Sequence, residues 1–243
     1  MRVVRWRWLA TIAAASVVVW FATAGLAAGA QLLTVLLLVV FPAAFSLQAG
    51  IADEVPDGIS RLGVYGGSAA GLLLLAGLVY GVARASGFGN ASFGLVLPPV
   101  DAALLWAAGI TAAGLAIQVA ARALGEGESA LLLYVLPRSD GDKAAFVGLS
   151  LCAGTCEELA YRGFLLTALT TTTGNILAAA LIGAAAFGVL HAYQRRDGVL
   201  RAGLLGLLLT LPVVATGSIV PSMIAHTALD VIGGIFAQRL FRA

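Results

Sequence analysis

Charged residues in this chain fall in short clusters, and long apolar runs without any charge separate them. No charged residue stands between Arg7 and Asp53, and most of the later runs are long enough to cross the hydrocarbon core of a bilayer, which takes roughly 20 residues. Since 60% of the 243 residues are hydrophobic and only 11% are charged, the apolar surface exceeds what a soluble core could bury. The sequence therefore predicts an all-α, polytopic membrane protein.

Eight charge-poor stretches predict membrane-spanning helices, with an error of about one in the count. The predicted spans cover residues 8–28, 31–49, 63–83, 101–121, 144–169, 175–193, 199–217 and 220–240. The boundary between the first two rests only on the sequence GLAAGAQ, which indicates a turn. Together the spans predict a transmembrane helix bundle that forms one integral membrane domain over residues 1–243.

The positions of lysine and arginine predict the orientation of the bundle. If the N-terminus is cytoplasmic, eight crossings place the basic residues on the cytoplasmic side, except Arg84 outside and Arg162 within the membrane. We therefore expect a multi-pass protein of the cell membrane with both termini in the cytoplasm. A signal peptide is the alternative at the N-terminus, because MRVVRWRW is basic and AGA before Gln31 resembles a cleavage site, but the long apolar run favours an anchor.

The charge balance also limits the partners. A net charge of +2 with scattered arginines lacks the clustered basic face expected for nucleic-acid binding. The expected partners are membrane lipid and a membrane-associated protein or peptide; the sequence predicts no oligomeric state. Residues 125–142 are polar at both ends of a short apolar centre, which predicts a cytoplasmic loop, or alternatively a segment that lies on the membrane surface or gates a cavity.

The stretch TCEELAYRGF places Glu157, Glu158 and Arg162 inside a predicted span, where each charge costs roughly 3 kcal/mol on insertion scales. Glu158 and Arg162 are four residues apart and share a helical face, so we expect them to form an ion pair. Glu157 points about 100° away, onto a face with small neighbours and no cation. An unpaired carboxyl group in this setting suits proton transfer.

Two histidines are the expected partners of Glu157. His191 and His226 are the only histidines, both lie in predicted spans, and Asp230 follows His226 by one helical turn. For one histidine alone, a hydrogen bond at a helix contact is the commoner role. Straight helices would put His191 near the cytoplasmic end and His226 nearer the outer end, so convergence needs shifted boundaries, tilted helices, or breaks at Pro221 or near Pro212.

These residues resemble the three motifs of the CPBP family, the CAAX proteases and bacteriocin-processing enzymes, also called type II CAAX prenyl endopeptidases. The EExxxR, FxxxH and HxxxD motifs occur in this order at Glu157, Glu158 and Arg162, at Phe187 and His191, and at His226 and Asp230. Asparagine is the more usual last residue of the third motif, so Asp230 is a departure. The resemblance covers roughly residues 145–240, which we expect to form the catalytic core.

The resemblance implies an intramembrane endopeptidase that hydrolyses a peptide bond. In a metal-free mechanism, Glu157 and His191 activate water while His226 and Asp230 stabilise the oxyanion. In the alternative, Glu157, His191 and His226 bind zinc and Glu158 activates its water. The metal-free mechanism, with no cofactor, is favoured because the HExxH spacing is absent and Glu158 is committed to Arg162.

Two non-proteolytic functions remain as alternatives. A protein with the same fold could bind a peptide without cleaving it, as an immunity or scaffold protein. A proton-coupled transporter is the third possibility, because membrane carboxylates and histidines also form proton relays. Inverted repeats would favour the transporter, and the sequence has no internal symmetry.

Overall fold

The computed structural model describes residues 2–48, 58, 60–125 and 127–240, and every regular element in these ranges is helical. The α-helices are α1 (Arg2–Ala22), α2 (Ala28–Val35), α3 (Phe41–Gln48), α4 (Arg61–Ala85), α5 (Val100–Ala123), α6 (Ala130–Val135), α7 (Asp140–Glu158), α8 (Leu166–Thr173), α9 (Ile176–Leu190), α10 (Arg195–Leu208), α11 (Leu211–Thr216) and α12 (Val220–Leu240). Two π-helical segments, η1 (Leu36–Val40) and η3 (Leu159–Leu165), and one 3₁₀ turn, η4 (Ala192–Gln194), connect some of them. The predicted all-α class is confirmed.

Several of these helices are long and apolar enough to cross a membrane. Four such helical stretches are Ala28–Leu47, Arg61–Ala85, Val100–Ala123 and Ala192–Thr216, and three shorter apolar helices are Trp6–Ala22, Ile176–Leu190 and Val220–Phe236. Large apolar side chains also lie exposed on the outside of the bundle, among them Leu74 at 77% and Leu105 at 76%. A soluble protein rarely exposes so much apolar surface, whereas lipid covers it at no cost. These helices are membrane spans of a multi-pass protein.

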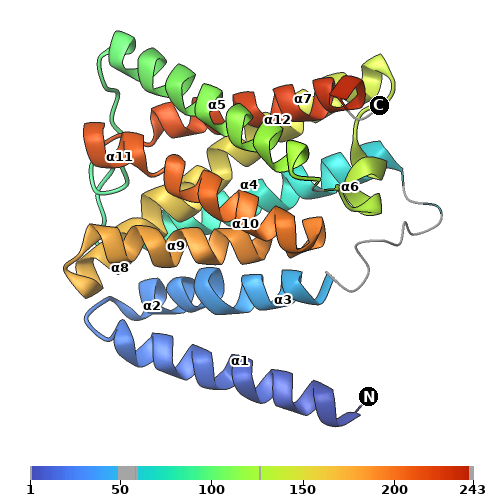
Figure 1. The fold of residues 1–243 in the computed structure, drawn as a ribbon. Helices are drawn as coiled ribbons and strands as arrows, with labels where there is room; N and C mark the ends of the chain where they lie inside the picture. The colour runs from blue at the N-terminus through green and yellow to red at the C-terminus, as the bar shows by residue number, and fades with distance from the viewer. Residues whose placement is uncertain (1, 49–57, 59, 126, 241–243) are drawn as a thin grey trace.

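Each predicted span coincides with one helix or a series of helices, although the boundaries shift. The turn predicted from GLAAGAQ lies at residues 23–27, so α1 ends at Ala22 rather than at residue 28. The span predicted over residues 144–169 is the continuous series α7, η3 and α8, over residues 140–173. The segment 125–142, predicted as a loop, contains the short helix α6. Figure 1 shows α1 at the edge of the bundle, beside α2.

Local sequence explains where the central series begins and ends. Ser139 caps the start of α7: its hydroxyl accepts from the Asp142 N–H, and the Asp142 carboxylate accepts from the Ser139 N–H, which forms a capping box. The π-helical segment η3 starts directly after Glu158, and wide turns of this kind often occur at functional sites. At the other end, Gly174 takes the left-handed conformation (φ +66°) that stops α8.

Close helix contacts at two glycines bring the central helices together. A Cβ atom at Gly154 on α7 would collide with the backbone of α12 at Met223 and Thr227. Likewise, a Cβ at Gly188 on α9 would collide with α10 at Val199 and Gly203. Because small residues let membrane helices approach closely, α12 packs directly on α7, and α10 packs on α9 (Figure 1).

Candidate active site

A buried ion pair anchors the first motif. Arg162 Nη1 donates to Glu158 Oε1 at 2.8 Å, and the two side chains are 3% and 0% exposed. The other end of the guanidinium, Nη2, donates to the Gly206 carbonyl on α10 at 2.9 Å, and the Arg162 guanidinium carbon lies 4.6 Å from the centre of the Phe187 ring on α9. Arg162 therefore neutralises Glu158 and also links the central helix series to α9 and α10.

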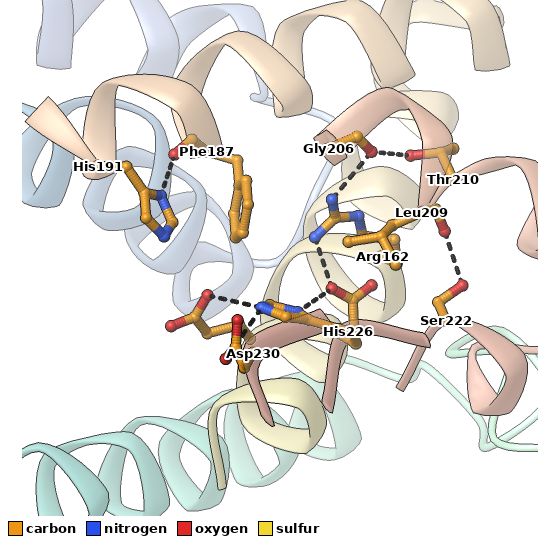
Figure 2. Close-up of polar contacts among 11 residues, drawn as sticks. Arg162, Phe187, His191, Gly206, Leu209, Thr210, Ser222, His226 and Asp230 are labelled. Atoms are coloured by element: carbon orange, nitrogen blue, oxygen red, sulfur yellow. Dashed lines mark hydrogen bonds and ion pairs between the residues drawn. The ribbon is translucent and has the colours of Figure 1, made fainter. Parts of the chain in front are cut away.

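The same carboxylate oxygen orients His226. Nδ1 of His226 lies 2.8 Å from Glu158 Oε1, the oxygen that also accepts from Arg162 (Figure 2). A carboxylate paired with arginine is ionised and can only accept hydrogen bonds, so the proton of this contact belongs to Nδ1. This bond fixes the direction of the imidazole and leaves its other nitrogen, Nε2, facing away from Glu158.

Nε2 of His226 faces two more carboxyl groups. It lies 4.0 Å from Glu157 Oε2 and 3.8 Å from Asp230 Oδ2, both beyond direct hydrogen-bonding distance. Glu157 Oε2 is buried and has no hydrogen-bond partner in the part of the chain that the structure describes. A buried polar atom without a partner is costly, so this oxygen calls for a water molecule or a ligand group. Glu157 is thus the unpaired carboxyl group that the helical spacing predicts.

His191 is held by its own helix. It caps the C-terminus of α9, and its Nδ1 lies 2.8 Å from the Phe187 carbonyl one turn earlier. Because a carbonyl can only accept, Nδ1 donates this bond, and Nε2 of the neutral ring is left as an acceptor. The spacing of Phe187 and His191 therefore fixes the tautomer of the histidine.

The Phe187 side chain contacts both histidine rings. Its ring centre lies 4.7 Å from the centre of the His191 ring and 6.0 Å from that of His226 (Figure 2). No hydrogen bond or ion pair joins His191 directly to Glu157 within the described ranges. The structure thus brings Glu157, Glu158, His226 and Asp230 into one cluster, and, among the described residues, His191 lines the same cavity as His226 and Asp230 without a direct bond to the cluster.

One cavity of about 440 Å³ contains both histidines in its lining, together with Phe187 and Asp230. His191 and His226 converge on this cavity, and of the routes that the sequence left open for such convergence, a shifted helix boundary is observed. Two features bring them together: α9 ends at Leu190, so that His191 lies at a helix end, and α12 packs closely on α7. Pro221 lies in the first turn of α12 and does not break it, whereas α10 does end shortly before Pro212.

The donor set does not fit a zinc site as the side chains lie. Among the described residues, no three or more His, Cys, Asp and Glu side chains are grouped closely enough to hold a metal ion. The proposed water activator of the zinc mechanism, Glu158, already accepts hydrogen bonds from Arg162 and His226 through one oxygen. Glu157, His191 and His226 would have to move before they could share a metal ion.

The other wall of the cavity comes from helices that the sequence did not connect with the site. Gln118 and Arg122 on α5, Glu128 before α6, and Arg201 on α10 line it, and Glu128 pairs with Arg201 at 2.8 Å. A glutamine within an otherwise apolar span was the signal available in the sequence. The position of Gln118 in the cavity depends on how α5 packs against α12, and no local sequence pattern reveals that packing.

The comparisons with known proteins bear on the motif-bearing part of the chain. None of the curated proteins and none of the solved structures matches the chain. Residues 141–232 match the family model described as type II CAAX prenyl endopeptidase Rce1-like. The matched range runs from the first turn of α7 into α12 and contains the EExxxR, FxxxH and HxxxD motifs. Residues 141–232 are therefore a domain of the Rce1-like type II CAAX prenyl endopeptidase family, as the motifs predicted.

Proposed function

We propose that the protein is an intramembrane endopeptidase that cleaves a membrane-associated protein or peptide, with Glu157 as the general base. The observation that carries this proposal is the buried Oε2 of Glu157, which has no hydrogen-bond partner among the described residues and lies 4.0 Å from Nε2 of His226. An oriented carboxyl group with a free oxygen can hold a water molecule and take its proton. The family assignment of residues 141–232 supports the same reaction class.

In the proposed reaction, Glu157 takes a proton from a bound water while the water oxygen attacks the carbonyl carbon of the scissile peptide bond. His191 assists by accepting from the same water through Nε2, which requires the water to bridge the two side chains. The tetrahedral intermediate then collapses, the C–N bond breaks, and the proton held by Glu157 passes to the leaving nitrogen. Hydrolysis is thereby complete, and Glu157 is regenerated as a carboxylate.

His226 and Asp230 are assigned to the developing oxyanion. Nδ1 of His226 is committed to Glu158, so Nε2 can donate to an oxyanion only when the ring carries both protons. The Arg162–Glu158 pair supports this by placing a carboxylate against Nδ1. Asp230 can donate only as a protonated acid. Glu158 and Arg162 are thus positioning residues that act through His226.

The proposed membrane arrangement has eight crossings, and the crossing formed by α7, η3 and α8 carries Glu157, Glu158 and Arg162. The cavity is lined by Arg122, Gln194 and Arg201, from segments in or near the loops that the distribution of basic residues assigns to the cytoplasm. The cavity then opens toward the cytoplasm, where both termini also lie. Protease accessibility of N- and C-terminal tags in sealed, oriented vesicles tests this arrangement.

The test of the reaction uses purified full-length protein in liposomes and internally quenched peptides, with and without a prenylated cysteine. We expect Glu157→Gln to lower kcat by about 10²- to 10⁴-fold, the usual contribution of a general base. Asp101→Asn on α5 is the matched control, because Asp101 is exposed and lies outside both the cavity and the matched domain. If Glu157→Gln cleaves the peptides at the wild-type rate, Glu157 is excluded as the base. If a chelator abolishes the activity of the wild type, the metal-dependent mechanism is favoured.

A peptide-binding protein without catalysis is the second candidate. The observation that favours it is the missing direct contact between His191 and Glu157, since a joint water is needed to couple them. For this function we expect wild type and Glu157→Gln to bind the peptides equally and to cleave none of them. Fluorescence anisotropy of labelled peptides, run beside the cleavage assay, separates the two functions.

A further inference from the structure

Five polar side chains line the cavity outside the three motifs: Gln118, Arg122, Glu128, Gln194 and Arg201. Four of them have partners within the chain. Glu128 pairs with Arg201 at 2.8 Å, the Gln194 amide donates to the Tyr193 hydroxyl at 3.0 Å, and Arg122 also has an interaction of its own. Gln118 has no hydrogen bond to any other described residue. The cavity thus offers one open amide.

The position of this amide relative to the candidate active site is defined by α12. The Gln118 Oε1 atom lies 3.6 Å from the point that a Cβ atom at Gly233 would occupy, so the amide lies against the bare backbone of α12. Gly233 follows Asp230 by three residues, which is about one helical turn, or roughly 5 Å along the axis. Gln118 therefore lies beside the reacting groups, toward the C-terminal end of α12.

An unpartnered amide within a membrane span needs a reason. Gln118 belongs to the apolar span Val100–Ala123, where a polar side chain that faces lipid or other apolar groups is expensive. An extended peptide in this cavity has a matching need, since its backbone N–H and C=O groups lose water and must find partners. The surrounding side chains Leu115, Val119, Leu205 and Leu229 offer none. A glutamine amide supplies both a donor and an acceptor.

We propose that Gln118 binds the main chain of the peptide substrate one or two residues from the scissile bond. Its amide oxygen accepts from a backbone N–H, and its amide nitrogen donates to a backbone carbonyl. Asp230 and Gly233 are about 5 Å apart along the axis of α12, and an extended peptide rises about 3.3 Å per residue. A peptide that runs along α12 therefore advances one or two residues between the level of Asp230 and the level of Gln118. Recognition of this kind is independent of the substrate side chain at that position. The inference rests on the proposed peptidase function and adds a substrate-binding residue to it.

The first experiment compares wild type with Gln118→Met and Gln118→Leu, which remove the amide but keep most of the volume. We expect KM for a quenched peptide that wild type cleaves to rise about fivefold if one hydrogen bond is lost and about thirtyfold if both are lost, because each neutral hydrogen bond contributes about 1 kcal/mol, and kcat to change less than twofold. Thr111→Val is the matched control on α5: Thr111 bonds its own helix at Ala107 and does not line the cavity. An unchanged KM in both Gln118 variants would overturn the proposal.

The second experiment separates main-chain binding from a general loss of structure. Peptides carrying one N-methyl group at successive positions around the cleavage site are compared within each variant. We expect one position, one or two residues from the scissile bond, where N-methylation raises KM for wild type but has no further effect on Gln118→Leu. Equal N-methyl penalties in both proteins at every position would contradict the assignment, even if Gln118→Leu lowers thermal stability.

The two proposals fail in different ways. If Glu157→Gln abolishes cleavage and the N-methyl scan shows no difference, the peptidase function stands and the role of Gln118 is wrong. If wild type cleaves none of the peptides, the peptidase function is not supported. In that case, the binding affinities of the same N-methylated peptides are measured for two proteins. One is the Glu157→Gln variant, and the other is the double variant with Glu157→Gln and Gln118→Leu. Loss of the position-specific penalty in the double variant supports the main-chain contact, and its persistence contradicts it.

Discussion

The two walls of the cavity differ in how their polar groups are held. On the motif wall, His226 and Asp230 line the cavity, and His226 is held from behind by Glu158, which accepts from both Arg162 and His226 and does not itself line the cavity. The side chains of Glu158, Arg162 and His226 are 0%, 3% and 10% exposed. This wall belongs to the matched range 141–232. On the opposite wall, α5 and α6 lie outside that range and contribute apolar side chains with Gln118 and Glu128 among them. The lesson is that a buried chain of polar contacts orients His226, whereas on the opposite wall Glu128 has a more exposed partner and Gln118 has none among the described residues.

This difference has an energetic consequence. Removing one member of a buried charge network leaves the others uncompensated in a low dielectric, so the motif wall tolerates little change. The α5 and α6 wall is held by apolar contacts, by the pair of Glu128 and Arg201, and by hydrogen bonds from Arg61 and Tyr65 on α4 to backbone carbonyls of α6, none of which is a fully buried charge network, so its residues can vary at lower cost. The following variants test this contrast, from the largest expected effect to the smallest.

Replacing Arg162 by methionine should have the largest effect. It removes the donor to Glu158 and to the Gly206 carbonyl, and leaves a buried carboxylate whose one remaining partner is His226. We expect a loss of about 3–5 kcal/mol in the free energy of unfolding, the usual cost of breaking a buried pair. Thermal denaturation in detergent measures it.

Lys143→Met is the matched control for this variant. Lys143 pairs with Asp140 in the first turn of α7, but the two side chains are 44% and 96% exposed. Because water and salt screen such a pair, no measurable change in the melting temperature is expected. Similar losses of stability in Arg162→Met and Lys143→Met would contradict the claim that the motif network stabilises the protein because it is buried.

Glu128→Gln probes the opposite wall. Glu128 and Arg201 are 11% and 12% exposed, so their pair is shielded but closer to solvent than the pair of Glu158 and Arg162. The neutral amide keeps one hydrogen bond to Arg201, and we expect a loss of about 1 kcal/mol, the approximate difference between a hydrogen bond of a charged pair and one with a neutral partner. A loss as large as that of Arg162→Met would remove the contrast between the walls.

Asp230→Asn should leave stability almost unchanged and alter the pH dependence of kcat instead. Asp230 is 37% exposed and 3.8 Å from Nε2 of His226, so the isosteric amide disturbs little packing. If Asp230 donates to the oxyanion, only its protonated form is active, and wild-type activity falls as pH rises through its ionisation. The amide donates at every pH, so the part of the fall that Asp230 causes should be absent from the pH–rate profile of Asp230→Asn, whereas the fall caused by loss of the second His226 proton should remain.

An identical profile for wild type and Asp230→Asn would show that the Asp230 proton plays no part in the rate. Asp101→Asn serves again as the control, because it removes an exposed carboxyl group on α5 outside the cavity. This comparison also tests the departure from the family pattern at this position, where asparagine is the more usual residue.

The helices and the motif residues could be predicted because they depend on local patterns. Charge-free runs give membrane helices, and the four-residue spacing of Glu158 and Arg162 puts their side chains on one helical face. The structure confirms the all-α class and the membrane spans, and the family match confirms the resemblance. The eight crossings, the single domain over residues 1–243, the core over 145–240 and the catalytic roles stay predictions.

The convergence of the site could not be predicted in the same way. Hydropathy does not reveal that α9 ends at Leu190, that His191 bonds back to the Phe187 carbonyl, or that Gly154 lets α12 approach α7. The sequence could therefore state that convergence of His191 and His226 needs shifted boundaries, tilted helices or breaks, but it could not show which of these occurs.

The sequence alone determined the environment of the chain, its helices and the identity of its three motifs, because hydrophobicity and helical periodicity act within a few turns. Only the tertiary structure decided that Glu158 holds both Arg162 and His226 through one oxygen, and that Gln118 lies against α12 at Gly233, about one turn beyond Asp230. The physical reason is that these contacts join helices far apart in the chain. Their geometry depends on how side chains pack between helices, and no local pattern encodes that packing.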